Sequence, residues 1–324
     1  MATDHHHEPA RAPAAAQVSA RRERRLRLVL VLNLSMVAVQ VVAGFVAHSV
    51  GLLSDAGHNL TDVAAVVLSL IAVRLARRPA TSSRTYGWHR STVLAAQANA
   101  AGILVVTVVI AIESIRRLLD PTPVHGGLVV VVALVALVVN GVSAFLLWER
   151  SADLNMRSAL LHMAGDAAAS AGVAVAGLVM WISNGMYWLD PLVSLGIGLL
   201  IGIEAIRLLK ATTDVLLEST PDSLELDKLA LAMGAVEGVE SVHDIHAWTL
   251  STEVLALSAH LVMEGHPSLE SAQAVANVVR SDLQQRFGIT HATLELECET
   301  CAPPGTESCA IDEAPAPTAH AHHH

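Results

Sequence analysis

Long apolar runs alternate with short polar segments over the first two thirds of the chain. Each run contains roughly the twenty apolar residues that an α-helix needs to cross about 30 Å of hydrocarbon. The runs lie near residues 27–47, 52–76, 93–115, 128–148, 159–183 and 191–209. We therefore expect residues 26–210 to form an α-helical, multi-pass transmembrane domain with six spans.

After residue 210 the pattern shortens to that of a small soluble domain. The predicted elements are a helix over 223–236, strands over 239–250 and 253–263, a helix from 268 to 287 and a strand over 290–298. Ser268 is placed to cap the start of the second helix, and Gly288 is placed to end it. The order predicts an αββαβ, metallochaperone-like domain over residues 211–300, an open α+β sandwich with a mainly antiparallel sheet and helices on one face.

The two ends of the chain lack any apolar period. Residues 1–25 and 301–324 are rich in Ala, Pro and His, and such segments cannot bury enough apolar surface to offset the entropy of ordering. We expect both to be disordered tails. Each carries a histidine triplet, at 5–7 and at 322–324, which suits weak metal gathering; the second triplet fits a cloning remnant equally well.

Composition and charge support a membrane protein with a defined orientation. Hydrophobic residues make up 53% of the chain and aromatic residues only 3%, as in an aliphatic helix bundle. Five arginines precede the first span and five lie between 74 and 90, whereas the first and fifth loops have no Lys or Arg. The positive-inside rule then places both termini in the cytosol. Arg116 and Arg117, at the outer end of the third span, are the one feature against this orientation.

Two predicted spans carry ionisable residues at the same spacing. His58 and Asp62 lie four apart in the second span, and His162 and Asp166 do so in the fifth, so each pair shares one helix face. Two imidazoles with two carboxylates suit tetrahedral Zn²⁺, whereas Mg²⁺ and Ca²⁺ prefer oxygen ligands alone. Each His bonding its own Asp is the structural alternative, but the repeat on two spans favours a shared metal site. Protons would compete for these ligands, so exchange of Zn²⁺ for H⁺ is the economical mechanism.

Six passages of the chain form recognisable motifs. They are VGLLSDAGHNLTDVAAVVLSL, TYGWHR, LLHMAGDAAASAGV, DPLVSLGIGLLIGIEAIRLL, DVLLESTP and VHDIHAWTL. They resemble their counterparts in the zinc-transporting branch of the cation diffusion facilitator family. The resemblance implies a homodimeric exporter, Zn²⁺/H⁺ antiport and a transport site on the four residues above. The chain departs from the family where Ser91 and Thr92 follow His89 and Arg90 in place of an acidic residue, so a loop metal site at His89 lacks its usual carboxylate.

The soluble domain offers a second candidate site for a structural or regulatory zinc ion. His243 and His260 lie on paired strands, and strand alternation places His291, Glu295 and Glu297 on one face of the last strand. A solvated sheet face is the alternative. His246 is expected on the opposite face from His243, as a packing residue.

Four further residues have expected roles. Cys298 and Cys301 form a C-x-x-C pair that can bind zinc, although a second pair is absent from the sequence. Asp55 is expected to cap the helix of the second span, and the alternative is that it lines the access to the transport site. Asn140 is expected to donate an interhelical hydrogen bond, and Asp190 to begin the sixth helix.

The predicted function is secondary active efflux of Zn²⁺, with Cd²⁺ or Co²⁺ as alternatives, and not enzymatic catalysis. No permanently bound cofactor is expected, and the net charge of −10 disfavours a nucleic-acid partner. An intramembrane protease using Asp62 and Asp166 is one other reading, but the chain has no HExxH motif and each Asp accompanies a His. A metal sensor anchored by its spans is another, and it leaves the intramembrane carboxylates without a role.

Overall fold

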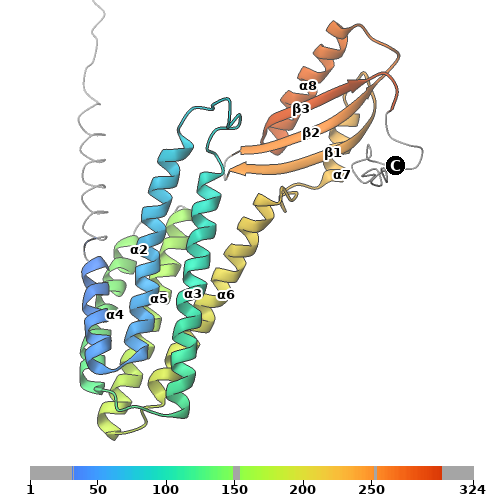
Figure 1. Ribbon diagram of the computed structural model, residues 1–324. Coiled ribbons are helices and arrows are strands. Elements are labelled where there is room, and N and C mark those ends of the chain that lie inside the picture. The colour runs from blue at the N-terminus through green and yellow to red at the C-terminus, as the bar shows by residue number, and fades with distance from the viewer. Residues whose placement is uncertain (1–30, 32, 149–153, 252–253, 301–324) are drawn as a thin grey trace, which may run out of the picture. The chain divides into compact units, whose positions relative to one another are not determined.

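A computed structural model gives the fold of the chain (Figure 1). The structure describes residues 31, 33–148, 154–251 and 254–300, so both predicted tails lie outside it. The described part of the chain divides into two compact units, one of the described residues up to 71 with those of 96–209, and the other of residues 72–95 with the described residues from 210 onward. Each unit has its own buried apolar core.

All six apolar segments predicted from the sequence are helical where the structure describes them. A helix over Asn33–Ala47 precedes α2 (Val50–Ala76), α3 (Ser91–Leu119), α4 (Gly126–Trp148), α5 (Leu154–Ser183) and α6 (Leu189–Leu216). Among the described residues, α2, α3, α5 and α6 are long and apolar enough to cross a membrane, whereas Asn33–Ala47 and Gly126–Val142 are shorter apolar helices. The helical transmembrane domain is thus confirmed, and the count of six spans remains a prediction.

Small residues let α4 and α5 pack closely. A Cβ atom at Gly126 would lie 2.7 Å from the backbone nitrogen of Trp181, and one at Gly177 would lie 2.8 Å from a methyl carbon of Val129. Close backbone approach at glycine is a common means of packing helices in membranes, where the hydrophobic effect does not drive helices together. The core around this contact includes the buried side chains of Met36, Leu52, Val132, Val173, Met180 and Ile197.

The N-terminus of α2 is held by a carboxylate from α6. Asp190 is buried and accepts a hydrogen bond from the Ser49 hydroxyl at 2.6 Å. It also accepts from the backbone N–H groups of Val50 at 2.6 Å and Gly51 at 3.2 Å, which are donors that a helix leaves free in its first turn. The expectation that Asp55 caps this helix is wrong, because α2 begins at Val50. Asp190 does lie in the first turn of α6, as predicted.

The two arginines that oppose the predicted orientation are paired locally. The Arg117 side chain donates to a carboxylate oxygen of Glu113 at 2.9 Å and to the backbone carbonyl of His48. Arg116 donates to the other oxygen of Glu113 at 3.4 Å. Arg117 therefore fixes the turn between the first helix and α2, which is a structural use for a cation at this end of α3.

The second unit contains the αββαβ domain that the sequence predicts. Its elements are α7 (Leu226–Gly234), β1 (Val239–Ser251), β2 (Val254–Met263), α8 (Leu269–Phe287) and β3 (Ile289–Glu297). Both ends of α8 are as expected: the Ser268 side chain accepts a hydrogen bond from the backbone N–H of Ser271, and Gly288 follows with a left-handed φ of 70°. The fold class is thereby confirmed.

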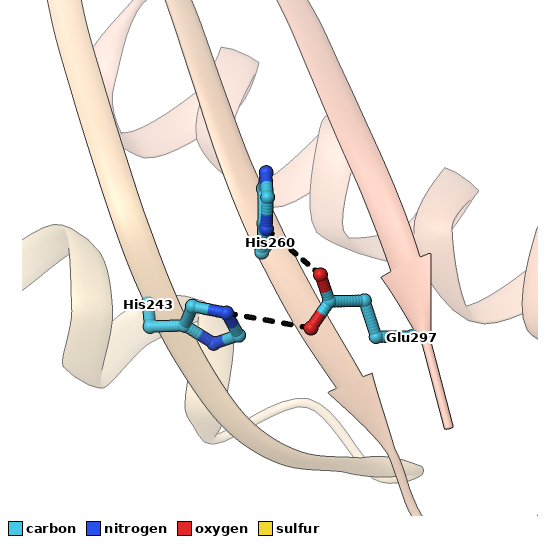
Figure 2. Close-up of side chains that lie close together, drawn as sticks. All are labelled: His243, His260 and Glu297. Carbon is cyan, nitrogen blue, oxygen red and sulfur yellow. Dashed lines mark ion pairs between the residues drawn. The ribbon is translucent and has the colours of Figure 1, made fainter. Parts of the chain in front are cut away.

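The strands form one sheet in the order β1-β2-β3. β1 and β2 pair antiparallel, with His243 opposite His260 (Figure 2), whereas β2 and β3 pair parallel. The expectation of a mainly antiparallel sheet is therefore wrong for β3. The reason is the connection, because α8 returns the chain to the end of the sheet where β2 begins, as a parallel pair requires.

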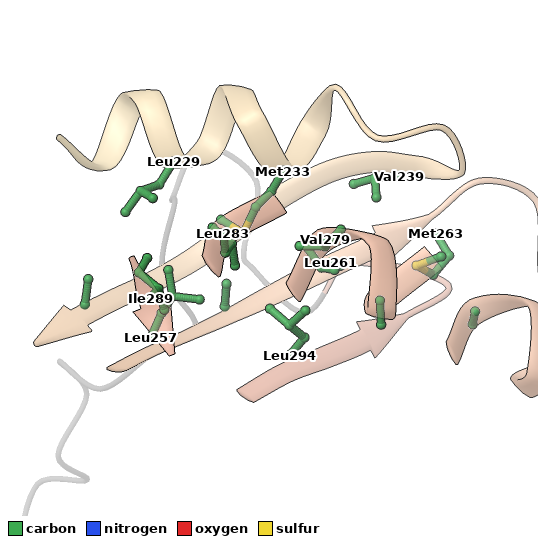
Figure 3. Close-up of a cluster of buried hydrophobic side chains, with 14 of the residues drawn as sticks. Leu229, Met233, Val239, Leu257, Leu261, Met263, Val279, Leu283, Ile289 and Leu294 are labelled. Carbon is green, nitrogen blue, oxygen red and sulfur yellow. The ribbon is translucent and has the colours of Figure 1, made fainter. Parts of the chain in front are cut away.

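Both helices of this domain pack on one face of the sheet (Figure 3). The shared buried cluster contains Leu229 and Met233 of α7, Leu257 and Leu261 of β2, and Val279 and Leu283 of α8. Because side chains alternate along a strand, His260 points to the opposite face. The histidines of the sheet thus lie on the face away from the helices.

Candidate metal centre

Three of the four predicted transport-site residues have described side chains, and these lie together. Nε2 of His58 is 2.9 Å from Oδ1 of Asp166 and 3.8 Å from Oδ2 of Asp62. One ligand atom from each of the three lies within 4.8 Å of the other two. Ligands of a tetrahedral Zn²⁺ ion with bonds near 2.0–2.1 Å stand about 3.3 Å apart. The three atoms therefore need only small shifts to hold such an ion.

The fourth residue, His162, lies on α5 one turn before Asp166, and its side chain falls outside the described part of the chain. Its backbone position keeps the i, i+4 relation that puts both side chains on one helix face. Since α5 is 30 residues long, Asp166 lies well inside the helix, level with His58. The two halves of the predicted site therefore meet across α2 and α5.

The exposure of the three side chains is graded. The Asp166 side chain is 4% exposed, that of His58 16%, and that of Asp62 32%. Asp62 lies one turn closer than His58 to the end of α2 that is expected to face the cytosol. A narrow cavity also reaches His58 between α2, α3 and α6, lined by Thr107 and Gly198 among others. A cation arriving from the Asp62 side would meet the buried carboxylate last.

A second group lies on the open face of the sheet (Figure 2). Oε2 of Glu297 is 3.3 Å from Nε2 of His243, and Oε1 is 2.8 Å from Nδ1 of His260. The imidazole rings stand edge to face, with centroids 5.2 Å apart. The three side chains are mostly buried, each at most 18% exposed, and they supply two nitrogens and one carboxylate, three of the four ligands of a typical zinc site.

The structure does not bring His291 to this group. His291 pairs with Ala256 of β2, six residues before Glu297 on β3, which corresponds to roughly 20 Å along a strand. Its ring lies edge-on to that of Tyr86, with centroids 5.6 Å apart. The two residues share a strand, but the length of the strand separates them.

One residue near this group was not predicted from the sequence. Asp244 has a left-handed φ of 52° and lies in a bulge, where two residues of β1 oppose one residue of β2. Its carboxylate oxygens are 3.5 Å from Nε2 of His260 and 3.4 Å from Nε2 of His246. The bulge inserts one residue, so His246 lies on the same face as His243 and the expectation of the opposite face is wrong. The only signal in the sequence was the HDIH passage itself.

The remaining candidates are placed as follows. His89 is exposed and belongs to neither metal-ligand group found among the described residues. Cys298 is exposed, and Cys301 lies outside the described residues, so their pairing is a prediction only. The side-chain amide nitrogen of Asn140 is buried without a hydrogen-bond partner in the part of the chain that the structure covers, so the expected interhelical bond is not made there.

Family comparison accounts for both units. Residues 26–217 match the cation efflux transmembrane domain, and residues 221–299 match the cytoplasmic domain of cation efflux proteins. The chain belongs to the cation efflux, or cation diffusion facilitator, family. This membership confirms the resemblance drawn from the motifs, and it places the cation efflux protein among transporters and not among intramembrane proteases.

Three relatives show how far the similarity extends. The cation efflux protein is 37% identical to the zinc transporter ZitB of Escherichia coli, over 88% of its own length and 89% of the relative's. It is 34% identical to the metal cation efflux system protein CzcD of Cupriavidus metallidurans, over 82% and 84% of the two chains. It is 30% identical to a cadmium, cobalt and zinc/H(+)-K(+) antiporter of Bacillus subtilis, over 81% and 84%. The similarity thus covers the helical and cytoplasmic domains together.

Proposed function

We propose that this protein exports Zn²⁺ from the cytosol in exchange for H⁺, and that His58, Asp62, His162 and Asp166 hold the ion in transit. Relatives whose names specify zinc transport, cation efflux and antiport support the assignment. The observation that carries it is the 2.9 Å contact of His58 with Asp166, which joins α2 to α5. Cd²⁺ and Co²⁺, which the name of the Bacillus relative includes, are candidate further substrates.

The charges of the site provide a reason for exchange. Two ionised carboxylates with a Zn²⁺ ion form a neutral unit, whereas the empty site would keep two negative charges in a weakly hydrated place. Protons that take the place of the metal restore neutrality, and they also convert the ligands to forms that no longer bind it. Release of Zn²⁺ and uptake of H⁺ are therefore linked by the same side chains.

The proposal also covers the surroundings of the site. Six spans with both termini in the cytosol agree with the charge pattern of the loops, and a family match to a cytoplasmic domain supports that location for residues 221–299. We assign the group of His243, His260 and Glu297 to a regulatory or structural zinc ion. A homodimer, as the family resemblance implies, is the expected assembly.

Transport by the purified protein in proteoliposomes tests the proposal. With an acidic lumen and Zn²⁺ outside, we expect zinc uptake that stops when the pH gradient is collapsed. His58→Ala should abolish this flux, while an exposed residue of the same unit, Asp120→Asn, should not change it. A metal sensor without transport predicts zinc binding but no flux in the unsubstituted protein, and that result would refute the proposal.

A further inference from the structure

A hydrogen-bond network of polar side chains lies beside the candidate transport site. The Asn59 amide donates to Oε1 of Gln40 at 3.0 Å, and the Gln40 amide donates to Oδ2 of Asp55. The Ser170 hydroxyl donates to the same oxygen of Asp55 at 3.2 Å. Gln40, Asp55 and Ser170 are fully buried. The network therefore connects the first helix, α2 and α5.

This network forms a second link between the two helices that carry the site. Asp55 precedes His58 by three residues, and Ser170 follows Asp166 by four. Residue numbers rise on α2 as they fall on α5, so the helices are antiparallel. At 1.5 Å per residue, the Asp55–Ser170 link lies about 4.5–6 Å along the helix axes from the His58–Asp166 contact. This second link between α2 and α5 thus lies about one helical turn from the metal site.

A carboxylate is an expensive choice for such a link. An asparagine at position 55 could accept the same hydrogen bonds without placing a charge in the membrane domain. The second oxygen of Asp55, Oδ1, is buried without a hydrogen-bond partner among the described residues. The hydrogen bonds account for the position of Asp55, and an ionised carboxylate there, one turn from His58, would add to the negative field that attracts a cation.

We propose that Asp55 is a positioning residue of the transport site: it is held by Gln40 of the first helix, and through Ser170 it fixes the separation of α2 and α5, which favours Zn²⁺ over the larger Cd²⁺. The inference rests on the proposed function and extends it to metal selection. A tetrahedral site selects by ligand distance only where its ligands cannot move apart. Loosening the link lets His58 and Asp166 separate, which benefits the ion with longer bonds.

Ser170→Ala is the sharpest variant, because it removes one hydrogen bond and leaves every ligand and the charge of Asp55 in place. We expect the ratio of transport efficiencies, Cd²⁺ over Zn²⁺, to rise roughly two- to tenfold, the effect of one buried hydrogen bond. Ser114→Ala is the matched control, since Ser114 is a fully buried serine of α3 with no hydrogen-bond partner for its hydroxyl in the described chain. Its ratio should stay that of the unsubstituted protein.

Asp55→Asn separates the link from the charge. It should lower the transport efficiency of both metals and leave their ratio nearly unchanged, because the amide oxygen can still accept from Ser170. An unchanged ratio in Ser170→Ala, or an equal loss of both metals in that variant, would reduce Asp55 to a structural residue and overturn the inference. Absence of zinc flux in the unsubstituted protein would instead overturn the proposed function, so the two failures are distinguishable.

Discussion

Asp166→Asn should nearly abolish zinc transport while leaving the fold intact. The substitution preserves the size of the side chain, and Asn can keep a hydrogen bond with His58. It removes the more buried of the two site carboxylates, whose Oδ1 is 2.9 Å from Nε2 of His58, and leaves a bound Zn²⁺ ion with an uncompensated positive charge. Loss of a partner that only supports a metal ligand costs about 10- to 100-fold. Loss of a direct ligand should therefore lower transport efficiency by about 100-fold or more, or roughly 2.7 kcal/mol in the barrier.

The assay is initial zinc uptake into everted vesicles, normalised to the amount of folded protein. Zinc binding by the cytoplasmic domain of the same variant should be unchanged, because His243, His260 and Glu297 are untouched. Asp120→Asn, which removes an exposed acid of the helical unit, provides the matched control. Uptake by Asp166→Asn within a factor of a few of the control would refute the reasoning, since the site would then work without its central carboxylate.

Two further predictions concern the cytoplasmic group and the packing of α4. In the full chain that carries Asp166→Asn, the further substitution Glu297→Gln should remove one high-affinity zinc ion per protein, as measured by competition with a chromophoric chelator. Glu299→Gln, at an exposed neighbour, should leave the number of bound zinc ions unchanged. Equal numbers in both variants would argue for a solvated sheet face. Gly126→Ala should destabilise the helical unit by about 1–3 kcal/mol through overpacking, because the new Cβ would lie 2.7 Å from a backbone atom of Trp181. Gly141→Ala is the control on the same helix, since a Cβ there meets nothing within 4 Å. Equal melting temperatures of the two variants in detergent would contradict the close packing.

Local signals predicted the elements well. Apolar runs long enough to span a bilayer marked the helices, and the pair Ser268 and Gly288 marked both ends of α8, because capping depends on a few adjacent residues. The β2–β3 pairing could not be read in the same way, since a strand pattern does not specify the direction of its neighbour. The direction of β3 depends on the end of the sheet to which α8 returns the chain.

The candidate site shows the same division between local and distant information. Spacing correctly paired His58 with Asp62 on one helix face, but His58 lies closer to Asp166 of α5 than to its own partner. Strand parity failed at His246 because the bulge at Asp244 adds one residue, and a shift of one residue reverses every side chain that follows. Asp55 was misread as a cap because the group that satisfies the start of α2 is Asp190, which lies more than a hundred residues away in the sequence.

The bond network of Asp190 restricts how the protein can change shape during a transport cycle. The helix that carries His58 and Asp62 begins with backbone donors that end on this one buried carboxylate of α6. If α2 slid or tilted alone, these hydrogen bonds would break and leave the buried carboxyl group and two backbone amides without partners, at a cost of several kcal/mol. We therefore expect the N-terminal end of α2 to move together with α6 during the cycle, and not independently of it.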